Sequence, residues 1–243
     1  MSKLIWSDEF DYEGPPDAAK WRLESGGHGW GNEELQFYTD RADSDTANAW
    51  VSDGKLHIRL RCEDYDGRKY TSARLNSKAS WQYGRIDVSA KLPKGSGTWP
   101  AIWMLGDTIH ERGWPSCGEI DIMEHVGRTQ DIVHFSLHSG KYNHALDTHL
   151  TFTKKFTRVS DTFNVYSIDW KKDKISFLFN DEVFVEWHKR ADEADGDTEG
   201  WPFNAPFYML LNVAYGGTFG GAQDDACLPQ SMEIEYVRVY RNE

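Results

Sequence analysis

Three carboxylates stand close together in the segment GEIDIMEH, residues 118–125. Glu119, Asp121 and Glu124 are set among Ile and Met, residue types that normally fill a core, where negative charge is costly. Paired carboxylates can cleave a glycosidic bond, since one attacks the anomeric carbon while the other stays protonated and releases the leaving oxygen. A solvated edge strand and a calcium site are the two alternatives at this point.

The spacing of the acids favours a strand with one irregularity. On a helix, Glu119 and Glu124 would diverge by about 140°. On a strand, Cys117, Glu119 and Asp121 share one face, and a β-bulge around Met123 would bring Glu124 to that face as well. The two Glu residues are then about 13 Å apart along the strand, and inward-leaning side chains leave a gap of about 6 Å. That gap is closer to the roughly 5–5.5 Å of retaining glycosidases than to the wider spacing of inverting enzymes.

Aromatic and polar side chains near these acids suit a sugar, although each also has a simpler interpretation. Trp99 and Trp103 in GTWPAIWML share a strand face, where they would be either platforms for sugar rings or core residues. The segment WGNEELQFY alternates polar side chains from Trp30 to Tyr38, which suits hydrogen bonds to hydroxyls or a polar loop. Asp121 lies between the two Glu residues and can hydrogen-bond one of them.

Two basic candidates remain. Arg74 in TSARL can orient a carboxylate or a substrate hydroxyl, or make a surface ion pair. His134 and His138 in VHFSLHSG share a strand face, which allows a metal pair, although no third ligand is evident and structural histidines are commoner. Cys117 shares the face of Glu119, which allows a place at the cleft floor, but a packing role is the expectation.

The chain that must position these residues is predicted to form mainly β-strands. Alternating patterns predict strands over 55–61, 84–92 and 231–242, and a hairpin over 174–187 that turns at Asn180 and Asp181. Short helices are predicted over 17–21 and 190–194. Many short strands divided by turn residues predict an all-β fold, a β-sandwich or jelly roll of two antiparallel sheets. With no repeat and no long linker, residues 1–243 are expected to form one domain.

Composition excludes several function classes. A net charge of −12 disfavours nucleic acid and anionic membranes, and no apolar run approaches a membrane span. The three cysteines allow at most one disulfide and form no Cys-x-x-Cys motif. The 11 Trp residues exceed what a core of this size needs and suggest surfaces that stack on a flat partner. The segment MSKLIWSDEF lacks the pattern of a signal peptide, so a removed leader or a cytoplasmic location is expected from the residues alone.

Eight segments in the same order resemble the laminarinase-like branch of glycoside hydrolase family 16 along essentially the whole chain. The segments are WSDEF, WGNEELQFYT, TSARLNS, GTWPAIWML, GEIDIMEHVG, LHSG, LLNVAYGG and IEYVRVY. The resemblance implies a jelly-roll sandwich whose concave sheet holds an open cleft. It also implies retaining, endo-acting hydrolysis of β-1,3-glucan or mixed β-1,3/1,4-glucan. It requires no catalytic cofactor and implies a secreted monomer whose partner is a β-glucan.

The resemblance also assigns roles to residues. Glu119 matches the nucleophile, Glu124 the acid/base, and Asp121 the residue that assists the nucleophile. Substrate-binding positions of relatives correspond to Asn32, Arg74, Trp99, Trp103, Trp114 and His138. A structural calcium ion on the convex side would be held by Glu9, the Gly54 carbonyl and Glu235, although relatives usually have Asp at position 235.

Three other functions fit the same residues less well. The chemistry could serve a transglycosylase, or a hydrolase of agar- or carrageenan-type polymers, because a covalent glycosyl intermediate can pass to a sugar instead of water. A glucan-binding module without catalysis is a third alternative, which the presence of both Glu119 and Glu124 disfavours.

Overall fold

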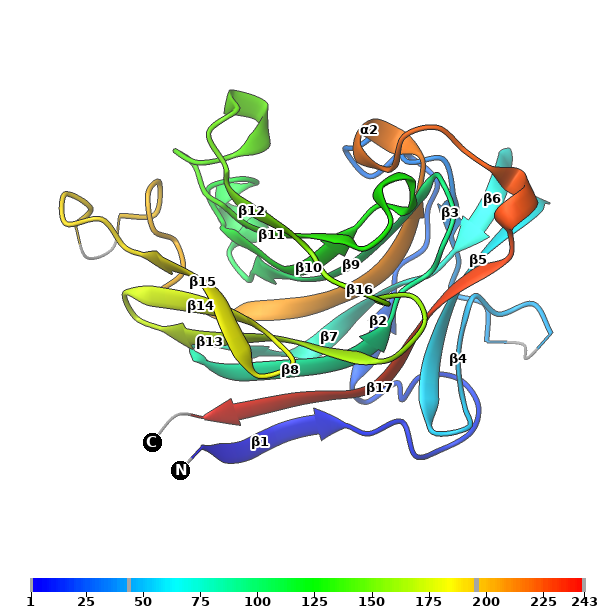
Figure 1. The fold of residues 1–243 in the computed structure, drawn as a ribbon, viewed down its shortest axis with the longest axis horizontal. Coiled ribbons are helices and arrows are strands. Elements are labelled where there is room, and N and C mark those ends of the chain that lie inside the picture. Colours follow the sequence, from blue (N-terminus) through cyan, green and yellow to red (C-terminus); the bar gives the residue numbers. More distant parts are fainter. Residues whose placement is uncertain (1, 43–44, 195–196, 242–243) are drawn as a thin grey trace.

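Two curved β-sheets lie one over the other in the computed structural model, which describes residues 2–42, 45–194 and 197–241 (Figure 1). The outer sheet runs in the order β15-β14-β13-β8-β17-β5-β6-β3, with β1 beside β17 and β4 beside β5. Its strands are β1 (Lys3–Asp8), β3 (Phe37–Tyr38), β4 (Ala49–Ser52), β5 (Lys55–Tyr65), β6 (Arg68–Ser72), β8 (Gly84–Lys91), β13 (Asn164–Lys171), β14 (Lys174–Phe179), β15 (Glu182–His188) and β17 (Gln230–Arg241).

The inner sheet carries the acidic segment. Its order is β12-β11-β10-β9-β16-β7-β2, so β10 lies between β11 and β9. Its strands are β2 (Trp21–Leu23), β7 (Arg74–Trp81), β9 (Thr98–Gly106), β10 (Glu119–His125), β11 (Ile132–His138), β12 (Leu150–Lys155) and β16 (Phe207–Tyr215). Neighbouring strands of the described residues pair antiparallel, except β3 and β6, which pair in parallel. Together the sheets confirm the predicted jelly-roll sandwich.

Apolar side chains from both sheets fill the space between them. Ile120 and Ile122 of β10 point into this core and are fully buried, as are Leu56 and Ile58 of β5 in the opposite sheet. Burying one such side chain contributes roughly 1.5–3 kcal/mol, so the alternating strands are held with one fixed face inward. The opposite face of β10 is thereby committed to the concave surface.

Strand predictions were more accurate than helix predictions. The predicted strands over 55–61 and 84–92 and the hairpin over 174–187 are confirmed. The strand predicted over 231–242 is confirmed up to Arg241, and Asn242 lies outside the described residues. Both predicted helices are wrong. Residues 17–21 turn because the Asp17 carboxylate accepts a hydrogen bond from the Ala19 N–H at 2.8 Å, and Trp21 already begins β2. Within 190–194, the Glu193 carboxylate accepts from the Arg190 N–H at 3.0 Å and closes a turn.

The helices that do form are single turns in the connections. They are α1 (Ile109–Arg112), α2 (Gly217–Gly220), η1 (Gly127–Thr129), η2 (His144–Leu146) and η3 (Asp225–Cys227). In the described part of the chain, none is long or apolar enough to cross a membrane. The thiols of Cys62, Cys117 and Cys227 are free, and Cys117 packs with Leu105 and Leu210, as its predicted packing role requires.

Candidate active site

A bulge in β10 turns all three acids to the concave face. Asp121 pairs with Ser136 of β11 and Glu124 with His134, so β10 advances three residues while its partner advances two. The register with β9 shifts at the same place, between Asp121 and Met123. The extra residue is Ile122, which has no partner in β9, whereas Met123 pairs with Ile102; both Ile122 and Met123 are fully buried. This confirms the predicted bulge, and it explains why an odd sequence spacing still gives one shared face.

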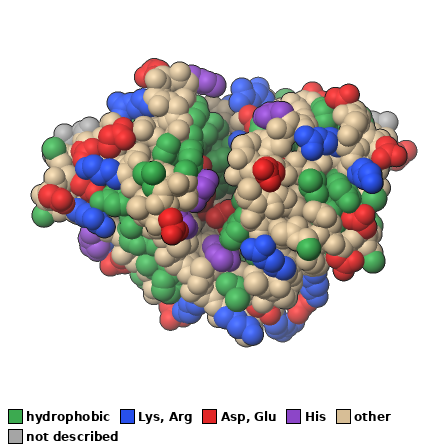
Figure 2. Space-filling view, turned by 90° about the horizontal axis from the view of Figure 1, so that it is seen from above, with side chains coloured by type: hydrophobic (Ala, Val, Ile, Leu, Met, Phe, Trp, Pro, Cys, Tyr) green, Lys and Arg blue, Asp and Glu red, His purple; other side chains and the backbone are tan. Residues whose placement is uncertain are grey.

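The three acids line one cavity of about 300 Å³ in the inner sheet. Its other lining residues are Trp30, Gly31, Asn32, Glu34, Arg74, Trp99, Ala101, Trp103, Leu105, Ile109, Trp114, His144 and Asn212. Figure 2 shows this hollow from above, with acidic and histidine side chains at its centre and hydrophobic ones along its walls. Five of the predicted substrate-binding residues, all except His138, therefore meet the catalytic candidates in the same cavity.

The partners of Glu119 are an indole and an imidazole rather than Lys or Arg. Its Oε2 accepts a hydrogen bond from the Trp114 indole N–H at 3.0 Å, and its Oε1 lies 3.8 Å from His138 Nε2. Burial and then the negative charge of Asp121 raise the pKa of Glu119 from its usual 4.5 to about 8. The contacts with His138 and Trp114 oppose that rise by stabilising the anion.

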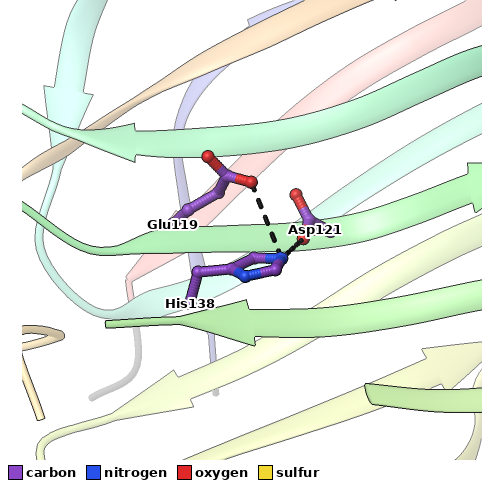
Figure 3. Close-up of side chains that lie close together, drawn as sticks. All are labelled: Glu119, Asp121 and His138. Atoms are coloured by element: carbon purple, nitrogen blue, oxygen red, sulfur yellow. Dashed lines mark ion pairs between the residues drawn. The ribbon is translucent and has the colours of Figure 1, made fainter. Parts of the chain in front are cut away.

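Asp121 contacts His138 of the neighbouring strand β11. His138 Nε2 lies 3.1 Å from Asp121 Oδ2, and Figure 3 shows the imidazole nitrogen facing both Asp121 and Glu119. Both Asp121 and His138 are buried. Burial, followed by the charge of Glu124, raises the pKa of Asp121 well above its ordinary range. His138 thus lies beneath the acids and orients them from the neighbouring strand.

Glu124 completes the group from the far side of the bulge. Its Oε1 accepts a hydrogen bond from the Trp99 indole N–H at 2.9 Å. Burial raises the pKa of Glu124 as well, while the Trp99 hydrogen bond lowers it. Because all three pKa values are raised, the group retains protons at neutral pH that separate carboxylic acids would release. Retained protons supply the acid form that general acid catalysis needs.

The same group also has the geometry of a small metal site. Ligand atoms of Glu119, Asp121 and His138 all lie within 4.8 Å of one another. Among the described residues, no other three His, Cys, Asp or Glu side chains come together in this way. The histidine pair considered from the sequence does not form, because His134 and His138 lie four residues apart along β11, about 13 Å. His134 instead packs edge-on against Phe219, with ring centroids 4.9 Å apart. The glycosidase chemistry proposed below uses these side chains without an ion.

Arg74 is fixed between two rings and a carboxylate. Its Nε lies 2.6 Å from Glu24 Oε2, and its guanidinium lies 4.7 Å from the Trp30 ring and 4.9 Å from the Trp103 ring. The ion pair predicted as one alternative for Arg74 is therefore present. The two rings and the Glu24 carboxylate hold the guanidinium in place, and Arg74 lines the cavity.

A buried polar network behind this wall was not predicted. Asn212 accepts from the Trp103 indole N–H at 2.8 Å and donates to the Tyr38 hydroxyl at 3.1 Å. Tyr38 and Gln36 both donate to the Glu34 carboxylate, at 2.9 and 2.6 Å. Gln36 and Tyr38 are thus buried supports for Glu34 rather than ligands of hydroxyls, whereas Glu34 itself reaches the cavity. The one sequence signal for Asn212 is a polar residue within an apolar strand segment, LLNVAY.

The residues of the predicted calcium site have other partners. Both oxygens of Glu9 accept from Arg238, the shortest contact being 2.7 Å, and this interaction lowers the pKa of Glu9. Glu235 accepts from the Ser89 hydroxyl at 2.6 Å. As the side chains stand, this arrangement does not fit an ion at Glu9, because a guanidinium already neutralises that carboxylate. The calcium site, with Gly54 as its third member, stays a prediction.

A β-sandwich whose concave sheet presents paired buried glutamates and tryptophans to an open cavity is the architecture of a polysaccharide-cleaving glycoside hydrolase. Comparison with known proteins identifies the family of glycoside hydrolases. The chain belongs to the glycosyl hydrolases family 16, whose family model matches residues 29–238.

Relatives and solved structures agree with that assignment. A beta-glucanase of Rhodothermus marinus is 47% identical, and the match covers 98% of this chain and 85% of that protein. A glucan endo-1,3-beta-glucosidase of Cryptopygus antarcticus is 36% identical, over 97% of this chain and 90% of that one. The X-ray structure of the laminarinase from Rhodothermus marinus superposes with a TM-score of 0.94 at 46% identity, covering 99% of this chain and 98% of that structure.

Proposed function

We propose that this protein is an endo-acting, retaining hydrolase of β-1,3-glucan, with mixed β-1,3/1,4-glucan as a second substrate. The observation that carries the proposal is the bulge in β10, which brings Glu119 and Glu124 to one cavity from either side of Asp121. The substrate class rests on the relatives, which are named beta-glucanase, glucan endo-1,3-beta-glucosidase and laminarinase.

The proposed reaction is a double displacement. The Glu119 carboxylate attacks the anomeric carbon, the bond to the leaving oxygen breaks, and Glu124 gives that oxygen its proton. Glu124 then takes a proton from water, whose oxygen displaces Glu119 and restores the starting configuration. Before each attack Glu119 must be ionised, which the Trp114 N–H and His138 favour. Asp121, in contact with His138, orients and assists the nucleophile.

The cavity walls suggest how the glucan is held. Trp103 and Trp114 present rings to the cavity, while Asn32 and Arg74 offer donors for hydroxyls. Trp99 is nearly buried, and its indole N–H is committed to Glu124. We therefore assign Trp99 to the support of the acid/base residue as much as to the sugar.

Product stereochemistry tests the proposal directly. Laminarin is incubated with the protein, and the first products are followed by proton NMR before mutarotation. We expect internal cleavage with β-configured new reducing ends. Products that first appear in the α configuration would contradict retention, and the absence of any new reducing end would favour the glucan-binding alternative, since one relative is a beta-1,3-glucan-binding protein of Penaeus monodon.

The roles of the two glutamates can be separated by azide rescue on an activated aryl β-glucoside. In Glu119→Ala, azide replaces the missing nucleophile and gives an α-glycosyl azide. In Glu124→Ala, azide attacks the covalent intermediate and gives a β-glycosyl azide. The opposite pairing of variant and product would exchange the two roles.

A polymer substrate also bears on where the protein acts. A glucan chain does not cross a membrane, so we propose that the protein acts outside the cell as a monomer. Activity recovered in the culture fluid of the native host, and a single monomer mass in light scattering, are the expected results.

A further inference from the structure

His138 supports the nucleophile through one of its two ring nitrogens. Its Nε2 lies 3.1 Å from Asp121 Oδ2 and 3.8 Å from Glu119 Oε1, and Figure 3 shows this nitrogen facing both carboxylates. Only a ring that carries hydrogen on Nε2 can stabilise these oxygens. The proposed reaction therefore needs both the hydrogen on Nε2 and this direction of the ring.

The second nitrogen of His138 does not hold the ring in this direction. A histidine with a defined role is usually fixed by the hydrogen bond that its other nitrogen makes, which also decides which nitrogen carries the hydrogen. The His138 side chain is buried, and its Nδ1 has no hydrogen-bond partner among the described residues. The orientation of His138 must therefore come from packing.

Two imidazoles of the connection between β11 and β12 pack on His138. The His149 ring lies parallel to the His138 ring, with centroids 5.5 Å apart and an angle of 7° between the planes. The His144 ring meets His138 edge-on, with centroids also 5.5 Å apart and an angle of 81°. Stacked aromatic pairs contribute roughly 0.5–1.5 kcal/mol, and turning one ring out of the shared orientation loses that contribution.

Strand register places His149 directly beside His138. Glu119 of β10 pairs with His138 of β11, and Leu137 pairs with Leu150 at the start of β12. One residue further along, His138 is opposite His149, so Glu119, His138 and His149 form a row on the concave face. His149 is not among the residues that line the active-site cavity, so it reaches the nucleophile through His138 rather than by touching the glucan.

The loop that precedes β12 fixes the backbone at His149. Asn143 is almost fully buried in this loop, where its Nδ2 donates to the Ser139 carbonyl and its Oδ1 accepts from the Leu146 N–H, each at 3.1 Å. The Thr148 N–H donates to the Asn143 carbonyl at 3.1 Å. These bonds close the loop immediately before His149, so the ring projects from a held position.

His149 meets His138 with an uncharged ring face. Burial and then the proximity of His138 lower the pKa of His149, while Asp147 opposes this change. The Nδ1 atom of His149 is itself buried, with no hydrogen-bond partner in the described part of the chain. The contact is therefore made by the flat ring and not by a polar atom.

We infer that His149 is a positioning residue for the nucleophile, because its ring holds His138 with Nε2 toward Asp121 and Glu119. The inference rests on the proposed function, in which Glu119 attacks the sugar. A His138 ring that turned away would leave Glu119 with the Trp114 N–H as its remaining donor. A flat side chain at position 149 is what this role requires, whereas ring nitrogens at that position are not.

Two apolar variants separate the flat ring from the volume that it fills. His149→Leu removes the ring, and His149→Phe keeps one. On laminarin oligosaccharides we expect His149→Leu to lower kcat about tenfold with KM within about twofold, because a misplaced group slows the chemical step without weakening binding. We expect His149→Phe to keep kcat within about twofold of the wild type, since the stacked pair is preserved.

Nitrogen-15 NMR of the imidazole rings gives a readout that does not depend on activity. The His138 signals are assigned by their loss in His138→Gln. We expect the wild type and His149→Phe to show a His138 ring with hydrogen on Nε2. In His149→Leu the same signals should move toward the average of the two neutral tautomers, because the ring is no longer held against the carboxylates.

His57→Leu supplies the matched control. His57 on β5 of the outer sheet is also a stacked imidazole, with its centroid 4.8 Å from that of Trp50 and an angle of 8° between the rings. This variant should change neither kcat nor the His138 signals.

Two results would overturn the positioning role of His149 while the β-1,3-glucanase proposal stands. One is equal behaviour of His149→Leu and His149→Phe, and the other is an unchanged set of His138 signals in His149→Leu. If the wild type releases no reducing ends from laminarin, the proposed function itself fails, and the NMR comparison still decides whether His149 holds His138.

Discussion

Acidic side chains have opposite surroundings on the two sheets. In the outer sheet they face cations, as in Asp87 with Arg85 at 2.7 Å and Glu233 with Lys91 at 3.0 Å. At the edge of that sheet, Glu9 pairs with Arg238. On β10 of the inner sheet, no Lys or Arg from the described ranges forms a salt bridge with any of the three acids. Their partners are two indole N–H groups and His138.

The acids of the outer sheet contribute to stability, whereas those of β10 are arranged for function. Pairing with Arg238 lowers the pKa of Glu9, whereas burial and like charge raise the pKa of Glu119 to about 8. The outer acids thus favour folding when they are ionised, while the β10 acids oppose it. Clustered carboxylates held without Lys or Arg partners are disfavoured in a fold unless they have another use, and perturbed pKa values of this kind concentrate at catalytic sites.

The largest effect should come from removing a glutamate of the inner sheet. Glu124→Gln removes the proton donor but preserves side-chain shape, so we expect kcat/KM on laminarin to fall by roughly 10²–10⁴-fold. Glu119→Gln removes the nucleophile and should leave activity at background. Reducing-end assays measure both.

Glu233→Gln on β17 supplies the matched control, because it makes the same exchange at a paired acid of the outer sheet. Its kcat/KM should stay within about twofold of wild type, since surface ion pairs contribute little and lie away from the cavity. Comparable losses in Glu124→Gln and Glu233→Gln would remove the distinction between the two groups of acids.

The pH dependence of activity should follow the inner acids alone. The raised pKa of Glu124 keeps it protonated above the usual 4.5, and kcat/KM should fall about tenfold per pH unit once that proton is lost. The acidic limb should appear where the nucleophile becomes protonated, which gives a bell-shaped profile. Measuring kcat/KM from pH 4 to 10 tests this, and Glu9→Gln should leave the bell in place. A profile flat from mildly acidic to alkaline pH would contradict Glu124 as the acid.

Most of the fold could be predicted from the alternation of apolar and polar residues along the strands. Alternation along β5, β8 and β17 places one face inward, so the strands and the sandwich follow from the sequence. The bulge between Asp121 and Glu124 was predictable for a specific reason: three acids must share a face, and parity forbids it without one extra residue. The short helices failed because Asp17 and Glu193 close turns through side-chain hydrogen bonds that outweigh helix propensity.

Features that depend on partners far apart in the chain could not be predicted. His138 was predicted to bind substrate, but its contact with Asp121 depends on the register between β10 and β11. The link from Asn212 to Tyr38 joins residues 174 positions apart. Arg238 as the partner of Glu9 likewise required the pairing of β1 with β17. Local patterns specify which face a side chain occupies, whereas register and packing specify what it meets there.

Stability should respond in opposite directions on the two sheets. The pKa of Glu119 is raised in the folded state, so the stability it contributes is complete below pH 4.5 and is lost as pH rises to about 8. Glu119→Gln should therefore become more stable than wild type between these values, by about 1–3 kcal/mol at pH 8. The pKa of Glu9 is lowered, so its contribution is present above pH 4.5 and lost in acid.

Glu9→Gln should accordingly be less stable than wild type at pH 7, by about 0.2–1 kcal/mol given its exposure, and equal to wild type in acid. Urea unfolding of the three proteins at pH 4, 7 and 8 measures these differences. Both variants changing stability in the same direction at pH 8 would contradict the assignment of opposite pKa shifts.

The smallest expected effect is that of calcium on the Tm, and it tests whether Glu9 of the outer sheet is already neutralised by Arg238. Arg238 already neutralises Glu9, so a chelator should shift the wild-type Tm by less than about 2 °C, a change that corresponds to about 0.5–1 kcal/mol. Arg238→Gln frees the Glu9 carboxylate, and added calcium should then raise Tm more in the variant than in the wild type, because carboxylate oxygens are the ligands calcium prefers. Glu233→Gln, which leaves Glu9 paired, should respond to calcium as the wild type does. A large chelator effect on the wild type would instead mean that calcium displaces the guanidinium and binds at Glu9, as the family resemblance predicts.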